Sequence, residues 1–136
     1  MKKYCMLLCS LLFVACTTTG PSSNLSIQSG TYTGTFSIMN YVGTDSPSTQ
    51  QSQTTFTFSD TGWYTCGGGL VPTGGGKYNV TGDSLYLQDM VAHLAIFDWT
   101  LILNGSFHGK VDGNKLTLTQ DDKAYHRYRN IVITRQ

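Results

Sequence analysis

The stretch VDGNKLTLT, residues 111–119, places a tight turn between two runs of alternating side chains. Glycine next to asparagine at the centre of a short connection is typical of a two-residue β-hairpin, because such turns need backbone with positive φ. The stretch VTGDSL, residues 80–85, repeats the pattern V-x-G-[DN]-x-L. The two stretches therefore predict two β-hairpins of the same kind.

Alternation with a period of two continues outward from these hairpins and favours β-strands. In the segment 31–38, threonine and serine alternate with Tyr32, Gly34, Phe36 and Ile38. Eight strands are predicted, around residues 31–38, 55–58, 63–66, 77–80, 84–88, 100–111, 115–120 and 124–134.

The connections between these strands are mostly short, so consecutive strands are expected to pair antiparallel. Loops are expected at 43–52 and at the glycine-rich segment 67–76, and a single helical turn within 89–98 is expected to plug one end. Such a set of strands closes into an up-and-down barrel or folds into a sandwich. We predict an all-β fold, an eight-stranded antiparallel up-and-down barrel, because closure removes the exposed edges.

The composition agrees with a β-protein and excludes some partners. All eight acidic residues are aspartate, which favours turns and caps, and glutamate, which favours helices, is absent. The nine basic residues nearly balance the acidic ones, and no basic cluster exceeds His126–Arg129. We therefore expect no nucleic-acid partner.

The N-terminus predicts secretion and a lipid anchor. Lys2 and Lys3 precede about a dozen uncharged, mostly apolar residues, the pattern of a signal peptide that is too short to span a bilayer. The sequence FVAC, residues 13–16, resembles the lipobox of bacterial lipoproteins, which implies lipidation at Cys16. The expected organisation is a signal peptide at 1–15, a lipidated cysteine and polar tether at 16–29, and a barrel domain at 30–136.

This organisation separates the four cysteines. Cys5 and Cys9 would leave with the signal peptide and Cys16 would carry lipid, so Cys66 would remain as a lone thiol without a disulfide partner. A solitary thiol of this kind is expected to be buried and inert.

The residues from 30 onward resemble the lipocalin-like (calycin) group of bacterial lipoproteins. The similarity rests on GTY at 30–32, where lipocalins carry G-x-W, on DWTLILNGSF at 98–107 and on VDGNKLTLT at 111–119. It implies the barrel, a lipid-anchored position in the cell envelope, and the outer membrane of a Gram-negative bacterium as the expected location.

Residues with catalytic or metal-binding chemistry are scattered along the chain. The glycine-rich segment lacks the G-x-x-x-x-G-K-[ST] pattern of a phosphate-binding loop. His93, His108 and His126 lie on separate predicted elements without metal-ligand spacing. We therefore predict no catalytic residues, no metal site, no cofactor and no enzymatic activity.

The aromatic residues are the candidates for a ligand site. They are expected either to fill the barrel as its core or, if one end is open, to line a pocket for a small apolar ligand. Arg127 and Arg129 either share the inward phase of Ile131 and Ile133 or are turned outward by a bulge near Asn130. The candidate ligand-lining residues are Tyr32, Phe36, Phe56, Phe58, Trp63, Trp99 and Phe107.

Two functions remain open from the sequence. The first is a membrane-anchored, lipocalin-like binding protein for a small apolar ligand. The alternative is a structural or interaction module of the envelope with a filled core, no ligand and no catalysis, whose protein partner the sequence does not identify.

Overall fold

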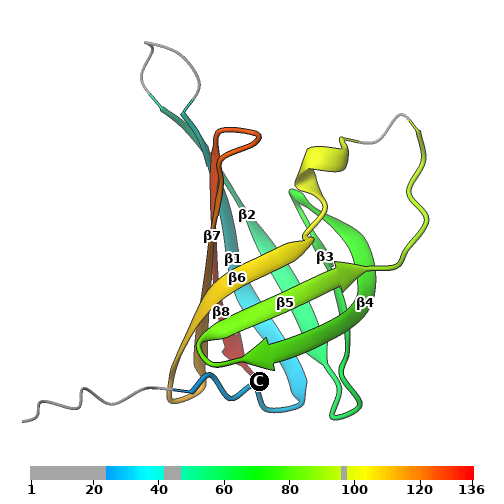
Figure 1. Ribbon diagram of the computed structural model, residues 1–136, viewed down its shortest axis with the longest axis vertical. Helices are drawn as coiled ribbons and strands as arrows, with labels where there is room; N and C mark the ends of the chain where they lie inside the picture. Colours follow the sequence, from blue (N-terminus) through cyan, green and yellow to red (C-terminus); the bar gives the residue numbers. More distant parts are fainter. Residues whose placement is uncertain (1–23, 42–46, 96–97) are drawn as a thin grey trace, which may run out of the picture.

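The computed structural model describes residues 24–41, 47–95 and 98–136 (Figure 1). The signal peptide, Cys16 and the first part of the predicted tether lie outside these residues. Within the described ranges the backbone forms eight β-strands and one short 3₁₀ helix, η1 (Trp99–Leu101). The strands are β1 (Gly30–Asn40), β2 (Ser48–Phe58), β3 (Trp63–Gly68), β4 (Val71–Thr81), β5 (Ser84–Asp89), β6 (Gly105–Asp112), β7 (Lys115–Asp122) and β8 (Arg127–Arg135).

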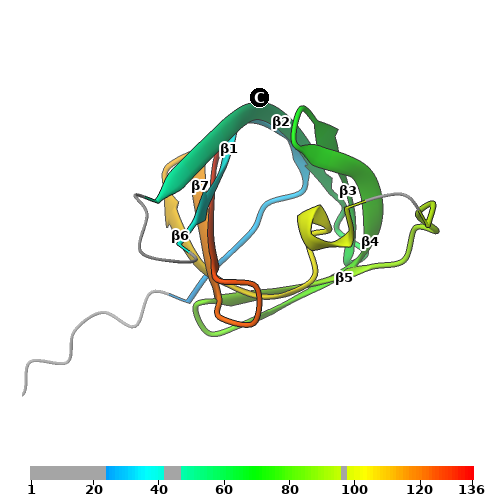
Figure 2. The same ribbon diagram turned by 90° about the horizontal axis from the view of Figure 1, so that it is seen from above.

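The strands close into a barrel. Each strand pairs antiparallel with the next, and β1 pairs with both β2 and β8, so that Phe36 lies opposite Ser52 on one side and Ile131 on the other. Figure 2 shows the resulting ring of strands seen from above. Closure gives both edge strands a partner, which removes the exposed edges of an open sheet. The predicted all-β, up-and-down barrel is confirmed.

The two predicted hairpins are also present and explain the glycines in them. Gly82 connects β4 to β5 with φ 61°, and Gly113 connects β6 to β7 with φ 59°. Positive φ at the first central residue is typical of the type II′ turn, which matches the twist of the flanking strands. The left-handed backbone falls on the glycine in both turns and not on Asp83 or Asn114.

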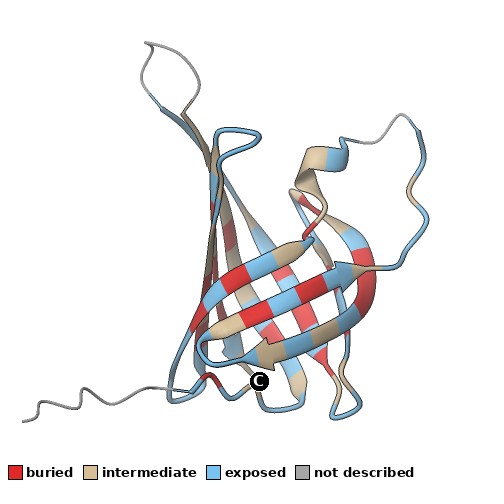
Figure 3. Cartoon of the chain, in the orientation of Figure 1, coloured by how far each residue is buried: buried red, intermediate tan, exposed pale blue. Residues whose placement is uncertain are grey.

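Side chains alternate between the interior and the outer surface along most strands, as the stripes on β5 and β6 in Figure 3 show. On β1, for example, Tyr32, Phe36 and Ile38 are buried while their neighbours are less so. The fully buried side chains, all less than 2% exposed, come from strands around the barrel and from the segment before β6, and include Phe36, Phe56, Phe58, Phe107, Leu85, Leu87, Leu103, Leu116, Leu118, Ile131 and Ile133.

Aromatic rings fill the barrel interior towards the end at which β1 begins and β2 ends, the lower end in Figure 1. Phe58 stacks on Phe56 with ring centroids 5.9 Å apart. Tyr32 and Tyr78 meet Phe58 edge-on, at 5.6 Å and 5.2 Å. These geometries are the favoured ones for packed aromatic pairs. This part of the barrel interior is therefore a packed core.

Trp63 lies outside this core, and its expected inward position is wrong. It is 47% exposed on the outer face of β3, where the next residue, Tyr64, takes the buried phase. The Lys77 ammonium group lies 5.6 Å from the centre of the Trp63 ring. Trp63 is the first residue of β3, and successive side chains of a strand point to opposite faces. A shift of one residue in the alternation therefore exchanges the inward and outward side chains.

The last residues of the predicted tether, 24–29, pack against the lower end of the barrel. The Leu25 amide donates to the Gly82 carbonyl at 2.7 Å, and the Leu25 side chain is buried. A Cβ atom at Gly109 would come 2.5 Å from a Leu25 methyl carbon, so Gly109 makes room for this leucine. The segment therefore plugs this end and belongs to the folded domain.

Two predicted loops are largely strand. β2 begins at Ser48, inside the expected loop 43–52, of which 42–46 lies outside the described residues. The expected loop 67–76 is a hairpin, in which only 69 and 70 lie between β3 and β4. Most glycines of this segment lie within the two strands, because the hydrogen bonds of a sheet need only backbone groups. At Gly76 a side chain would not fit, since a Cβ atom would collide with the Gln88 carbonyl of β5.

The segment between β5 and β6 also differs from the prediction. The helical turn is η1, just after the expected range 89–98, of which 96–97 lies outside the described residues. The strand expected from 100 begins only at Gly105, and the last strand begins at Arg127 rather than 124. Asp98 accounts for the turn, because its carboxylate accepts from the Thr100 amide at 3.0 Å and caps the helix.

Candidate functional site

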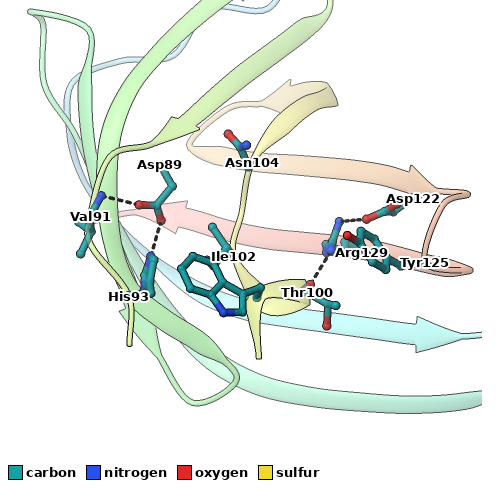
Figure 4. A pocket seen from close by; sticks show the side chains of 10 residues that line it. Asp89, Val91, His93, Thr100, Ile102, Asn104, Asp122, Tyr125 and Arg129 are labelled. Carbon is teal, nitrogen blue, oxygen red and sulfur yellow. Dashed lines mark hydrogen bonds and ion pairs between the residues drawn. The ribbon is translucent and has the colours of Figure 1, made fainter. Parts of the chain in front are cut away.

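The upper end of the barrel, opposite Leu25, holds a pocket of about 390 Å³. It lies where β5 and β7 end and β6 and β8 begin, beside η1. Pockets of this size accommodate small molecules. Its walls are formed by Asp89, Val91, His93, Trp99, Thr100, Ile102, Asn104, Asp122, Tyr125 and Arg129, most of which Figure 4 labels.

One wall is a buried acid–histidine pair. Asp89 ends β5 on the inward phase of Leu85 and Leu87. Its carboxylate accepts from the Val91 amide at 2.8 Å and lies 3.3 Å from His93 Nε2, with both side chains at most 7% exposed (Figure 4). These contacts fix the first turn of the chain after β5.

The opposite wall is built around Arg129, which is only 3% exposed. β8 continues without a bulge, so Arg129 keeps the inward phase of Ile131 and Ile133, which decides between the two positions left open by the sequence. Its Nη1 donates to Asp122 at 2.9 Å and to Gln120 at 2.5 Å. A buried guanidinium needs such partners, because an unpaired buried charge is costly.

Arg129 also holds η1 above the pocket. Its Nη2 donates to the Thr100 carbonyl at 2.6 Å, and Arg127 Nη1 donates to the Thr100 hydroxyl. The Thr100 hydrogen bonds to Asp98, more than the nearby arginines, lower the pKa of that carboxyl from its ordinary value. Two arginines of β8 and one aspartate thus tie a single helical turn to the rim.

One hydrogen-bond donor of the Arg129 side chain has no partner among the described residues. Within the described part of the chain, Arg129 Nε is buried and has no hydrogen-bond partner. A buried donor without a partner costs about 1–3 kcal/mol. The Nε atom is enclosed by protein and has almost no accessible surface, so a ligand in the pocket does not reach it as the side chain stands.

Aromatic rings form the exposed rim of the pocket. Trp99 is 55% exposed and meets the His93 ring edge-on, with centroids 6.0 Å apart. Tyr125, in the turn between β7 and β8, is 57% exposed. Large aromatic side chains left open to solvent beside a pocket offer flat contact surfaces to a ligand.

The lining as a whole is mixed rather than apolar. It contains two carboxylates, Asp89 and Asp122, and one guanidinium, Arg129. With histidine counted as neutral, the pocket therefore carries one net negative charge. Such a site suits an uncharged polar molecule better than an anion.

The candidate ligand-lining residues do not form one site. Trp99 lines the pocket at the rim, and Trp63 lies on the outer wall. The remaining five, all at most 4% exposed, are packed in the core below: Tyr32, Phe36, Phe56, Phe58 and Phe107. The polar residues Asp89, Asp122 and Arg129 were not predicted as ligand contacts, although each continues the inward phase of its strand.

A second hollow, of about 510 Å³, is larger but shallower and more open to solvent than the pocket at the barrel end. It lies on the outer face of the barrel, among residues such as Met39, Tyr41 and Tyr128. Met39 of β1 and Tyr128 of β8 point away from the barrel interior, and Tyr41 directly follows the end of β1. We therefore take the pocket at the open end as the candidate site.

The described residues offer neither a metal-ligand cluster nor a membrane-spanning helix. Across 24–41, 47–95 and 98–136, no three histidine, cysteine or acidic side chains are grouped as ligands for a metal ion. His108 lies 3.3 Å from Asp83 at the exposed opposite end, far from His93 in the fold. In the same ranges no helix has the length and hydrophobicity that a membrane span requires.

Cys66 lies in β3, and its buried thiol has low reactivity. Burial, together with the nearby Asp89 carboxylate, raises its pKa from 9.0 to about 12. The Sγ atom lies 3.9 Å from the Pro72 carbonyl, to which it donates. Since the thiolate is the nucleophilic form, the raised pKa makes the Cys66 thiol a weak nucleophile at neutral pH.

Alkylation of Cys66 by iodoacetamide at pH 8 is therefore expected to be about a thousandfold slower in the folded protein than in guanidinium chloride. Mass spectrometry of the peptide that carries Cys66 measures the rate, with Cys66→Ala as the blank. Equal alkylation rates in the folded and the unfolded protein would contradict the buried position of Cys66.

Because the folded pKa of Cys66 exceeds 9.0, the buried thiol stabilises the fold below about pH 9, and this contribution to the stability is lost as the pH rises towards about 12.

Comparisons with protein-family models, with curated proteins and with solved structures find no match for this chain. The assignment of a function consequently rests on the barrel and on the pocket at its open end.

Proposed function

We propose that this protein is a lipid-anchored, lipocalin-like binding module of the bacterial cell envelope that holds a small molecule at the open end of its barrel. The observation that carries the proposal is the pocket of about 390 Å³ at the open end of the barrel, with Asp89, Asp122 and Arg129 in its walls and Trp99 at its rim. The site has concave shape, aromatic surface and a few oriented polar groups, which are the usual attributes of a small-molecule site. The proposal includes no catalytic step and no cofactor.

In an anchored protein, the pocket would lie at the end of the barrel away from the attachment of the tether. The described chain begins at Asn24, beside the closed end, whereas Asp89 and Arg129 lie at the other end of the barrel. From a lipidated Cys16 to residue 24 the chain spans at most roughly 30 Å. If Cys16 is lipidated, the tether would therefore join the domain beside its closed end, at the opposite end of the barrel from the pocket.

The packed interior limits where the ligand sits. A site deep in the barrel would have to displace Phe56 and Phe58, which are at most 1% exposed. The same packing is the observation in favour of the second candidate, a filled-core structural module of the envelope with no ligand. The two functions differ in whether the pocket at the open end is occupied.

Native mass spectrometry of the purified protein tests binding directly. We expect a bound species that is retained in Tyr86→Ala, which changes an aromatic residue on the outer wall, and is lost or reduced at least tenfold in Trp99→Ala. Both side chains are about half exposed, so neither change should impair folding. An unliganded mass in the wild type, with no ligand retained after incubation with a cell-envelope extract, would favour the filled-core alternative.

Lipidation is tested by replacing Cys16. Cys16→Ser is expected to abolish incorporation of labelled palmitate and to move the protein from the membrane fraction to the soluble fraction, since stable anchoring needs the acyl chains. Cys9→Ser is the matched control, because this cysteine lies within the predicted signal peptide and should leave both readouts unchanged. Membrane partitioning that survives Cys16→Ser would refute the anchor.

A further inference from the structure

The charge balance and the rim of the pocket indicate the class of ligand, an inference that rests on the proposed binding function. We infer that the pocket takes a small organic cation, an ammonium group attached to an aromatic or apolar body. Two features of the site carry this inference. One is a buried carboxylate that has no lysine or arginine partner among the described residues, and the other is a rim of half-exposed aromatic side chains.

Asp89 is the source of the net negative charge of the pocket. Its side chain is 5% exposed, and within the described ranges its ion-pair contact is with His93, which is charged only when protonated. The other carboxylate, Asp122, is balanced by the Arg129 guanidinium at 2.9 Å. A buried charge without a permanent counter-charge is costly. A cation in the pocket would offset this cost, whereas an uncharged molecule would not.

The charge of Asp89 acts on a second group in the barrel. Burial and, after it, the Asp89 carboxylate raise the pKa of the Cys66 thiol to about 12. The carboxylate thus opposes the formation of another negative charge nearby, as expected in a poorly solvated interior. For the same reason it would attract an ammonium group in the pocket and repel a carboxylate or phosphate.

The walls also offer acceptors for an ammonium group. The hydrogen bond from Arg129 reaches Asp122 Oδ2, and the Asp122 side chain is 18% exposed. Asn104 adds a side-chain amide to the lining. An ammonium group carries three donors and no acceptor, while a carboxylate accepts at several lone pairs. Asp122 can therefore bind a donor from the ligand in addition to Arg129.

The aromatic rim favours a cation over an uncharged molecule of the same shape. Trp99 and Tyr125 line the pocket and are 55% and 57% exposed. The face of an aromatic ring attracts a cation, and tryptophan does so most strongly. The chain contains such a contact elsewhere, since the Lys77 ammonium group lies 5.6 Å from the centre of the Trp63 ring. The rings at the rim also offer flat contact surfaces to an aromatic body.

A metal ion fits the pocket less well than an organic cation. Asp89 and Asp122 lie on opposite walls (Figure 4). Across the described ranges no three histidine, cysteine or acidic side chains are grouped as metal ligands. A volume of about 390 Å³ also accommodates a molecule with a body of its own. The cation is accordingly organic.

Three probes of similar shape separate charge from shape. Phenethylammonium, phenethyl alcohol and hydrocinnamate share a phenyl ring on a short chain and end in an ammonium, a hydroxyl and a carboxylate group. Trp99 lines the pocket and Trp63 lies on the outer wall, so their indole N–H signals in a ¹H–¹⁵N spectrum separate binding in the pocket from binding elsewhere. Trp63→Phe assigns the two signals.

We expect phenethylammonium, at about pH 8 and low salt, to shift the Trp99 signal progressively while the Trp63 signal stays in place. It should bind at least about tenfold more tightly than phenethyl alcohol, and hydrocinnamate should bind more weakly still. Equal affinities for the ammonium and the alcohol would mean that the pocket recognises only the aromatic body, and would overturn the inferred ligand class.

Asp89→Asn tests the source of this preference. The substitution removes the charge and keeps both the size of the side chain and an oxygen that accepts from the Val91 amide. It should bring the affinities for phenethylammonium and phenethyl alcohol to within about twofold of each other. Asp121→Asn is the matched control, because it removes the same charge from an exposed side chain of β7 that accepts from Tyr41. It should leave the tenfold preference unchanged.

If Asp89→Asn fails to fold, as judged by the dispersion of its spectrum, the comparison of the three probes on the unmodified protein decides. A Trp99 signal that does not respond to phenethylammonium, or a preference that survives in Asp89→Asn, overturns the inference. The proposed function is tested apart, by native mass spectrometry. A bound species there without a response to phenethylammonium leaves a binding module for another class of ligand. An unliganded protein that responds to none of the three probes removes both proposals.

Discussion

Phe58→Ala is expected to destabilise the protein by about 3–5 kcal/mol, a large part of the total stability of a domain of this size. Phe58 is 1% exposed and its ring contacts Phe56, Tyr32 and Tyr78 at centroid distances between 5.2 Å and 5.9 Å. Removing it leaves a cavity between rings that are attached to different strands and cannot all close in on it. Guanidinium chloride unfolding followed by circular dichroism measures the loss.

Trp63→Ala is the matched control for this prediction. Trp63 is also an aromatic residue of the β2–β3 region, but it is 47% exposed and the Lys77 ammonium group lies over its ring. Its replacement should cost less than about 1 kcal/mol. Similar losses for Phe58→Ala and Trp63→Ala would mean that the inward and outward phases of this hairpin are assigned incorrectly.

The second large effect is expected at Gly34, in the middle of β1. A Cβ atom there would overlap the Val132 carbonyl oxygen and lie 2.8 Å from the Ile133 Cα atom, both in the backbone of β8. Backbone atoms of a paired strand cannot rotate away as a flexible side chain can. Gly34→Ala is therefore expected to cost about 3 kcal/mol and to lower the melting temperature, measured by differential scanning calorimetry.

Gly67→Ala shows whether the effect comes from this close approach. Gly67 is also a strand glycine without positive φ, and a Cβ atom there would lie 3.4 Å from the nearest neighbour, the Thr73 hydroxyl. This substitution should be neutral within about 1 kcal/mol, since alanine restricts the unfolded chain. A Gly34→Ala variant as stable as Gly67→Ala would show that β1 and β8 are not in the close contact described.

The barrel was predictable because its information is local. Turn glycines at 82 and 113 and the alternation of residues such as Tyr32, Phe36 and Ile38 act over a few residues, and the pairing of neighbouring strands follows from short connections. The errors occur where local signals point the wrong way. The glycine-rich segment 67–76 has the composition of a loop, yet its two halves pair with each other as the ends of β3 and β4, and β4 also pairs with β5.

The pocket was less predictable, although a signal for it exists. Asp89, Asp122 and Arg129 each continue the inward phase of an apolar strand to the same end of the barrel. Polar residues on an inward phase indicate a site where strands emerge from the core. The sequence shows this on each strand separately, but not that the three ends meet.

The sequence by itself determined the number of strands, the two glycine hairpin turns and the order of pairing, because period-two patterns and turn chemistry depend on neighbouring residues. Only the tertiary structure decided that the aromatic residues pack as a filled core, that Trp63 faces solvent, and that Arg129 is buried against Asp122 below η1. These outcomes depend on which strands face one another across the closed barrel. That arrangement is set by closure and packing, which act between residues far apart in the chain.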